Sequence, residues 1–255
     1  MVEFLEDPNI AEEWKKKFPA RRRTRDLKKY NALGVKRSIA LALHNSTTSF
    51  GNFFSQTVAD DAVVAMHPDL MEDRGYCSMW TFSVVHKDNQ VLAYRVGQYR
   101  DDRDAFANKR SIGFPGALGA DDLSLFSEDS FGAEECAISV LQQDLDLSLA
   151  AFDRSDSQRP KIDSVMAVSG LGGNLELVIV LLWNCPKWFE PVTRRLSLNN
   201  PEWLHLEARH NNIEDFEPWS VQVLERLTEA TRRANIGNSQ DYHSTIGVSE
   251  IRARE

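Results

Sequence analysis

The chain has 255 residues, of which 42% are hydrophobic and 27% are charged, and its formal net charge is −8. This length and balance predict a globular protein with one sizeable domain and room for a smaller appendage. The longest apolar stretch, 175–183, contains Glu176 and falls well short of the roughly 20 residues that cross a bilayer. A membrane-spanning helix is therefore excluded, and no membrane partner is expected.

The cysteines and the N-terminal residues indicate the cellular setting. Cys77, Cys136 and Cys185 are widely spaced and form no CxxC pair, so neither a disulfide framework nor a zinc site is expected. The stretch "MVEFLEDPNIAEEW" is acidic and lacks the basic-then-apolar order of a signal peptide. Both features favour the cytoplasm.

A densely basic segment, 15–37, contrasts with the acidic remainder of the chain. It contains an arginine cluster made of Arg21, Arg22, Arg23 and Arg25. No aromatic platform or nucleic-acid motif accompanies this charge, so a solvated face, or docking on the chain's own acidic body, is favoured over nucleic-acid binding. Nucleic acid stays open as a partner through the arginine cluster.

The elements expected first along the chain are helices. Residues 8–74 show helical patterns interrupted by Pro19, Gly34, the polar stretch "HNSTTSFGN" and Pro68. We therefore expect residues 1–74 to form a helical, basic N-terminal extension.

From residue 79 the pattern changes to strands. The β-rich "MWTFSVVH", the turn "KDNQ" and the return strand "VLAYRVGQY" predict a hairpin, and 159–168 with 175–183 predict a second strand pair. Helices are expected at 136–147 and from about 218 to 233. This order predicts an α/β sandwich with a mixed sheet over 75–235, followed by a flexible C-terminal tail at 236–255.

Four stretches in this order resemble a Nudix hydrolase domain of the MutT-related type. They are "KRSIGFPGALGADD", "VLQQDLDL", "LELVIVLLW" and "FEPWSVQVLERL", and the resemblance spans 76–227. It implies a Nudix-like α/β/α sandwich. Gly113 and Gly116 match the family's glycine strand, and the resemblance implies that they line a ligand site.

The catalytic motif of that family is largely replaced. Ser139 stands where the family has Arg, and Val140 and Gln143 stand where it has Glu. The remaining matches place Phe131 at an earlier Glu, Asp144 at the last Glu and Asp146 at a Gly. The resemblance thus leaves a Nudix box that is degenerate, with one carboxylate kept.

The chemistry of the family shows what this loss means. Its members cleave a diphosphate linkage by water attack, with carboxylates on one helix face holding Mg²⁺. Valine cannot ligate a cation, and a Gln amide lacks the negative charge that favours one. Glu134 and Glu135 project roughly 130° from that face and do not replace the lost groups. Asp144 is left as the candidate metal ligand, or as a solvated helix residue.

We therefore expect a Nudix-fold protein that binds a nucleotide, another diphosphate ligand or a partner protein with little or no hydrolysis. The candidate ligand-binding residues are Gly113, Gly116, Gln143 and Asp144. No catalytic residue is assigned and no cofactor is firmly predicted, with Mg²⁺ as the candidate if the chain is active. Two alternatives stay open: a divergent Mg²⁺-dependent pyrophosphohydrolase of nucleoside diphosphate derivatives, and an interaction or nucleic-acid-binding protein acting through 15–37.

The helix at 136–147 also predicts part of the core. Ile138, Leu141 and Leu145 share one stripe at helical spacing. We expect this stripe to pack under the strand that carries Leu177, Ile179 and Leu181.

Overall fold

The structure is a computed structural model that describes residues 31–44, 46–96, 108–123, 128–152, 158–169, 175–191, 198–208 and 212–246. Its strands are β1 (Ala32–Lys36), β2 (Thr47–Thr48), β3 (Val63–Met66), β4 (Tyr76–Lys87), β5 (Gln90–Val96), β6 (Arg110–Ser111), β7 (Gly113–Ala117), β8 (Lys161–Ser169), β9 (Leu175–Asn184) and β10 (Leu198–His205). The helices are α3 (Arg37–Ala42), α4 (Phe50–Ala59), α5 (Ala133–Leu145) and α6 (Pro218–Ile246). Short 3-10 helices are η2 (Pro68–Leu70), η3 (Ala120–Asp122), η4 (Glu128–Ser130), η5 (Leu149–Phe152) and η7 (Ile213–Asp215).

The strands form the mixed sheet that the sequence predicts. The central path runs β10-β5-β4-β9-β8-β2, with β4 and β9 parallel and the other neighbours on this path antiparallel. The predicted pair β8 and β9 is confirmed. The β4–β5 hairpin is also present, although these two strands pair only next to the turn, at His86–Val91 and Lys87–Gln90. The rest of β4 pairs with β7 and β1 instead.

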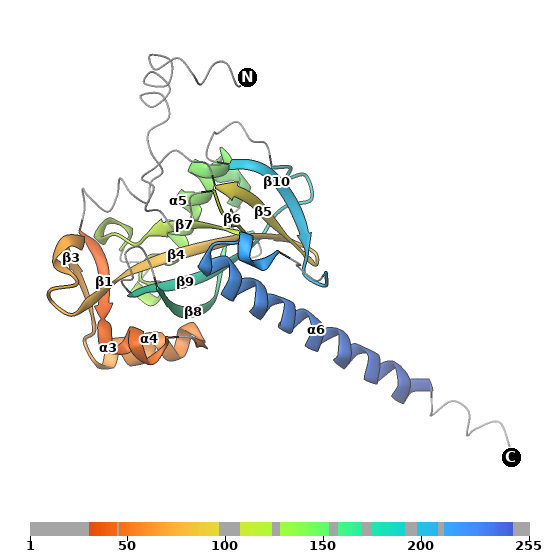
Figure 1. Cartoon of the computed structure of the whole chain (residues 1–255), viewed down its shortest axis with the longest axis horizontal. Coiled ribbons are helices and arrows are strands. Elements are labelled where there is room, and N and C mark those ends of the chain that lie inside the picture. Colours follow the sequence, from red (N-terminus) through yellow and green to blue (C-terminus); the bar gives the residue numbers. More distant parts are fainter. Residues whose placement is uncertain are drawn as a thin grey trace, which may run out of the picture.

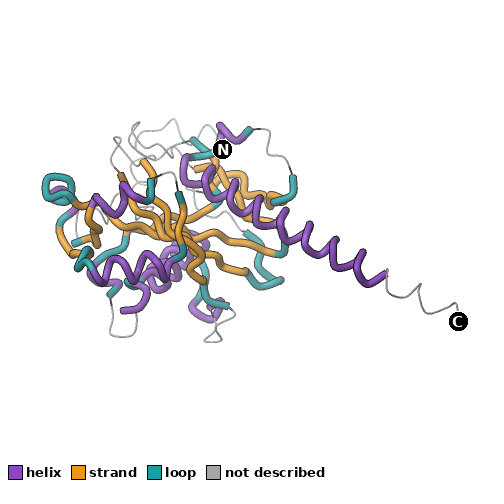
Figure 2. Tube along the Cα trace, turned by 90° about the horizontal axis from the view of Figure 1, so that it is seen from below, coloured by secondary structure: helices purple, strands orange, loops and turns teal. Residues whose placement is uncertain are grey.

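Helices cover both faces of this sheet (Figures 1 and 2). Successive side chains of a strand point to opposite faces. On one face of β4, the Thr81 hydroxyl lies 3.5 Å from the Cys136 sulfur of α5. On the other face, Trp80 and Phe82 pack edge-on against Trp219 of α6, with ring centroids 5.9 and 5.7 Å apart. The arrangement is the α/β/α sandwich expected from the sequence.

The N-terminal segment is only partly helical, which corrects our expectation for residues 8–74. In its described part, α3 and α4 are helices, but β1 and β3 are strands, and β1 lies between β3 and β4. Leu33, Val35 and Phe53 belong to the same buried core as the central strands. Residues 31–74 thus extend the sheet and its core. The arginine cluster lies outside the described residues.

The C-terminal helix corrects a second expectation. It begins at Pro218 as predicted but continues to Ile246, so the first part of the expected flexible tail is helical. Its buried side chains, among them Val223 and Leu224, lie in the first turns. Figure 1 shows the later turns projecting away from the sheet. In the described part of the chain, no helix is long and apolar enough to span a membrane.

Candidate functional site

The backbone at both ends of α5 adopts the left-handed conformation. Gly132, immediately before the helix, has φ 72°, and a Cβ there would lie 2.2 Å from the Asp122 carbonyl oxygen. Asp146 caps the C-terminus with φ 55° and ψ 40°. Glycine adopts this conformation without strain, and Asp is among the few other residues that tolerate it. Asp146 thus ends α5 with a backbone conformation that glycine adopts most easily.

The core stripe of α5 is rotated from the one predicted. Leu141 is fully buried, as expected, but Ile138 and Leu145 are only partly buried at the edge of the core. Cys136 and Val140 are more deeply buried than either. The prediction for the strand beneath is confirmed. The β9 residues Leu177, Ile179 and Leu181 are fully buried, and Ile179 is in register with Thr81 on the α5 side.

A glycine contact explains this rotation. A Cβ on Gly116 of β7 would lie 2.6 Å from a Val140 methyl carbon, 2.8 Å from the Thr81 hydroxyl and 3.0 Å from the Cys136 sulfur. These separations are below van der Waals contact, so α5 approaches β7 this closely only because residue 116 has no side chain. Gly113 packs on the other face of the sheet, where a Cβ would overlap the Phe82 ring. Both predicted ligand-binding glycines thus have packing roles.

The predicted ligand face of α5 has three different environments. Val140 is 2% exposed and packs into the core. Gln143 is exposed, and Asp144 is half-buried. The first of the three positions therefore belongs to the interior, and only the other two reach the surface.

Phe131, which the sequence resemblance matched to an earlier Glu, is also part of the core. Its ring packs against three phenylalanines of α4, with centroids 4.9 Å from Phe54, 6.2 Å from Phe50 and 6.3 Å from Phe53. The sequence predicted that these residues of α4 belong to a separate extension, and it did not predict this contact. In the structure, α4 covers the turn from which α5 begins.

Two nearby carboxylates have structural partners. Glu135 forms an ion pair with Arg159, at 3.2 Å between Nη2 and Oε1, and Asp122 accepts a hydrogen bond from the Gly119 N–H at 2.8 Å. In the part of the chain that the structure describes, no group of three or more His, Cys, Asp or Glu side chains is placed to hold a metal ion. Among its described residues, α5 thus supplies no cluster of three carboxylates for Mg²⁺.

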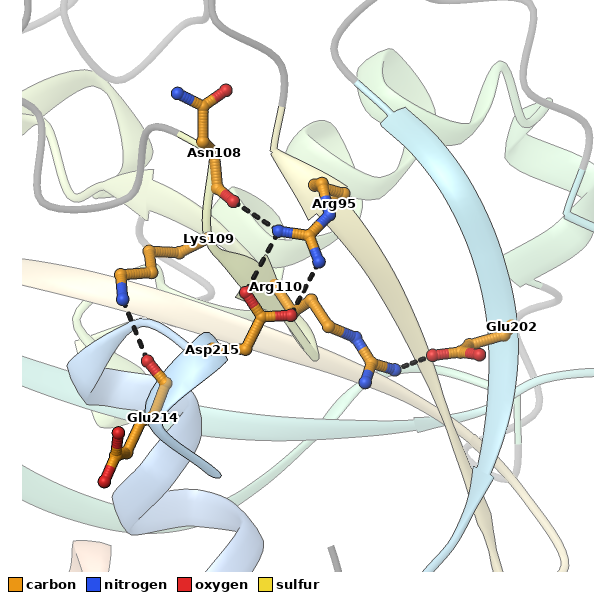
Figure 3. A network of polar contacts seen from close by, with 7 residues as sticks. All are labelled: Arg95, Asn108, Lys109, Arg110, Glu202, Glu214 and Asp215. Carbon is orange, nitrogen blue, oxygen red and sulfur yellow. Dashed lines mark hydrogen bonds and ion pairs between the residues drawn. The ribbon is translucent and has the colours of Figure 1, made fainter. Parts of the chain in front are cut away.

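A second polar cluster, absent from the sequence predictions, joins the sheet to the segment before α6 (Figure 3). Arg95 of β5 binds both carboxylate oxygens of Asp215, at 3.0 and 2.6 Å, and holds the pKa of that carboxyl below its ordinary value. Arg110 of β6 pairs with Glu202 of β10 and lies over the Phe216 ring. These contacts fix η7 against the sheet.

No family model matches the chain, and no curated protein matches it. Among solved structures, the fold is similar to Tm1382, named as a candidate Nudix hydrolase, with TM-score 0.53 and 15% identity over 78% of this chain and 99% of that chain. A Nudix hydrolase from Alicyclobacillus acidocaldarius gives TM-score 0.44 and 10% identity over 60% of this chain and 91% of its own. The E. coli dihydroneopterin triphosphate pyrophosphohydrolase gives TM-score 0.41 and 12% identity over 60% of this chain and 95% of its own. The likeness to Tm1382 is one of fold, and the chain has the Nudix fold.

Proposed function

We propose that this chain is a non-hydrolysing Nudix-fold protein that binds a nucleotide or a related diphosphate compound. The observation that carries the proposal is the burial of Val140 against Gly116. A carboxylate in place of Val140 would be surrounded by a glycine strand, a thiol and a hydroxyl, with little access to water. Such burial of an unpaired charge is strongly unfavourable.

Two further positions support the same proposal. Phe131 is packed against α4, and Gln143 is a neutral amide on the surface. Asp144 alone offers a carboxylate from the family's motif, and Mg²⁺ held by a single protein carboxylate depends on substrate phosphates for most of its ligands. Efficient metal-assisted attack of water on a diphosphate is therefore not expected.

The same helix still offers groups that can recognise a ligand. The Gln143 side chain can donate hydrogen bonds to phosphate oxygens, and the Asp144 carboxylate can accept them from sugar hydroxyls. Their position, one exposed and one half-buried at the C-terminal end of α5, suits a ligand that rests on the surface of the helix. We assign Gln143 and Asp144 as ligand-binding residues on this basis.

The proposal is tested by measuring binding and turnover on the same samples. Calorimetric titration with ADP and ADP-ribose, each with and without Mg²⁺, is combined with product analysis over many hours. We expect binding without turnover, weakened by Asp144→Asn and by Gln143→Ala. Glu190→Gln, which changes an exposed carboxylate outside α5, should leave binding unchanged.

Each alternative function has its own outcome in this design. Mg²⁺-dependent turnover that Asp144→Asn abolishes would make the chain a divergent pyrophosphohydrolase and would refute the proposal. Failure to bind either compound would also refute it. Salt-sensitive binding of DNA or RNA that is lost when the arginine cluster is neutralised would then favour a nucleic-acid-binding role.

A further inference from the structure

The strand β3 forms an outer edge of the sheet. Among the described strands it pairs only with β1, in an antiparallel ladder without a register shift. In Figure 1, β1 separates it from β4, and β3 lies at the margin of the described part of the chain. The side of β3 that faces away from β1 is therefore a free strand edge.

The register shows which backbone groups face this free edge. The Lys36 N–H donates to the Ala62 carbonyl oxygen at 3.0 Å, and an antiparallel ladder alternates between hydrogen-bonded and non-hydrogen-bonded pairs. The next hydrogen-bonded position on β3 is therefore Val64. Val63 and Ala65, on either side of it, direct their N–H and C=O groups away from β1. These groups can pair with an added strand.

The side chains of β3 suit the same role. Val63, Val64 and Met66 are half-buried, and Ala65 is exposed. The turn that follows the strand carries a further apolar side chain, Leu70, which is 45% exposed. The strand itself has no charged residue, no proline and no bulge. Edge strands commonly carry such features, because these features prevent pairing with other chains.

The two ends of the central strand path are protected against added strands. β10 contains Pro201, which has no N–H to donate, and its register with β5 shifts between Asn199 and Glu202. At the other end, β2 consists of only Thr47 and Thr48. A proline, a bulge and a very short strand each protect an edge. Compared with these two edges, β3 is unprotected.

The charges that flank β3 indicate what can bind there. Exposed acidic residues precede and follow the strand, namely Asp60, Asp61, Asp69, Glu72 and Asp73. The basic residues on the same segments and at the end of β1 are fewer, namely Lys36, Arg37 and Arg74. Lys36 is engaged as well, since its Nζ donates to the Asp60 carbonyl oxygen at 2.8 Å. Antiparallel pairing with a second copy would bring acidic ends together, so a partner with basic flanks is favoured.

We propose that β3 binds an extended peptide segment of a partner protein as an added strand, and that the apolar residues of this segment are flanked by basic ones. Backbone hydrogen bonds to Val63 and Ala65 hold the segment in place, and its basic flanks pair with the acidic residues at the two ends of β3. In strand addition of this kind, main-chain hydrogen bonds give affinity and side chains give specificity. The surface shares no residue with the ligand-binding positions assigned on α5, so the two proposals are independent.

Binding of a synthetic peptide to the full chain tests the proposal. The probe is a blocked, fluorescently labelled nonapeptide of alternating valine and threonine with two lysines at each end. We expect saturable binding in fluorescence anisotropy, weakened by salt, and slower hydrogen exchange at the amides of Val63 and Ala65. A peptide with glutamates in place of the lysines should bind at least about tenfold more weakly. No saturation by the lysine-flanked peptide up to about 1 mM, or equal binding of both peptides, would overturn the proposal.

A proline on the free edge provides the main variant. Ala65→Pro removes an outward N–H but no hydrogen bond to β1, and an edge strand tolerates proline at such a position. It should weaken binding of the lysine-flanked peptide at least about tenfold. Ala65→Val keeps the N–H and should bind like the wild type. Unchanged binding by Ala65→Pro would overturn the proposal. So would a wild-type dimer that Ala65→Pro dissociates in sedimentation equilibrium, because the occupant would then be a second copy.

If Ala65→Pro does not fold, Asp60→Asn with Asp61→Asn takes its place. Asparagine tolerates the positive φ of 44° at residue 61, so the backbone is kept while the charge is removed. Binding of the lysine-flanked peptide at low salt should weaken. Glu214→Gln with Glu225→Gln removes two exposed carboxylates elsewhere and should leave binding unchanged. Equal binding by the Asp60–Asp61 variant and the wild type would overturn the proposal.

Discussion

Gly116→Ala tests the contact on which the proposed loss of catalysis depends. The added methyl group would meet a Val140 methyl carbon at 2.6 Å and the Thr81 hydroxyl at 2.8 Å. Both are internal groups of a packed core, so relief requires α5 to shift away from β7. Overpacking of this kind typically costs about 1–3 kcal/mol of the free energy of unfolding.

A double-mutant cycle isolates the Val140 contribution. Val140→Ala alone should cost about 2 kcal/mol, because it removes two buried methyl groups. In the double variant with Gly116→Ala, the new methyl group enters the space that Val140 vacates. The double variant should therefore be about 1 kcal/mol more stable than the sum of the single effects predicts. The remaining contact with Thr81 keeps the rescue incomplete.

Urea unfolding, monitored by circular dichroism, measures these differences in the free energy of unfolding. The comparison requires that the slope of that free energy against urea concentration is the same in all variants. Gly51→Ala is the matched control, because Gly51 lies in α4 and a Cβ there would have no neighbour within 4 Å. That control should be neutral or slightly stabilising. If Gly116→Ala proves equally harmless, or if the two single effects simply add, Val140 does not pack on Gly116 and the argument against a carboxylate there fails.

Further predictions address the core, the metal site and the basic segment. Leu141→Ala should cost about 2–5 kcal/mol because the side chain is fully buried, and an unchanged urea midpoint would contradict this. Val140→Glu with Gln143→Glu should lower the thermal midpoint with or without Mg²⁺, because the carboxylate introduced at 140 would be buried against Gly116, where a cation does not reach it. A strong rise with Mg²⁺ already present in the wild type would contradict the degenerate-site proposal. Neutralising the arginine cluster should lower stability more at low salt than at high salt if it docks on the acidic body. Equal effects at both salt concentrations would exclude that docking.

Local patterns were sufficient to predict the central layers of the fold. The β-rich run at 79–86 and the apolar run at 175–183 correspond to β4 and β9, which are buried on both faces. The 3.6-residue period placed α5 correctly to within a few residues. The proposed replacements in a Nudix box depend on residue identity alone, so they could be proposed from the sequence.

The short N-terminal strands could not be predicted in this way. β1 and β3 are only five and four residues long, and apolar runs of this length suit a strand or a buried helix equally well. Their conformation is decided by pairing, β1 with Cys77 and Ser78 of β4, and β3 with β1. The partner residues are distant in the sequence, so no local pattern contains this information.

The residues of the candidate site also divide into features that the local sequence determines and features that only tertiary contacts determine. The sequence by itself determined that residue 140 carries no charge and that Ile138, Leu141 and Leu145 share a stripe of α5 next to the one that carries Val140. Only the tertiary structure decided which stripe faces inward, because the close approach of Gly116 turns Val140 toward the sheet. Nothing local distinguishes Glu217 from an exposed glutamate. Its burial raises its pKa, because folding brings β6 against the start of α6 and excludes water from the carboxyl, while the hydrogen bond from Ser111, far away in the chain, opposes part of that rise.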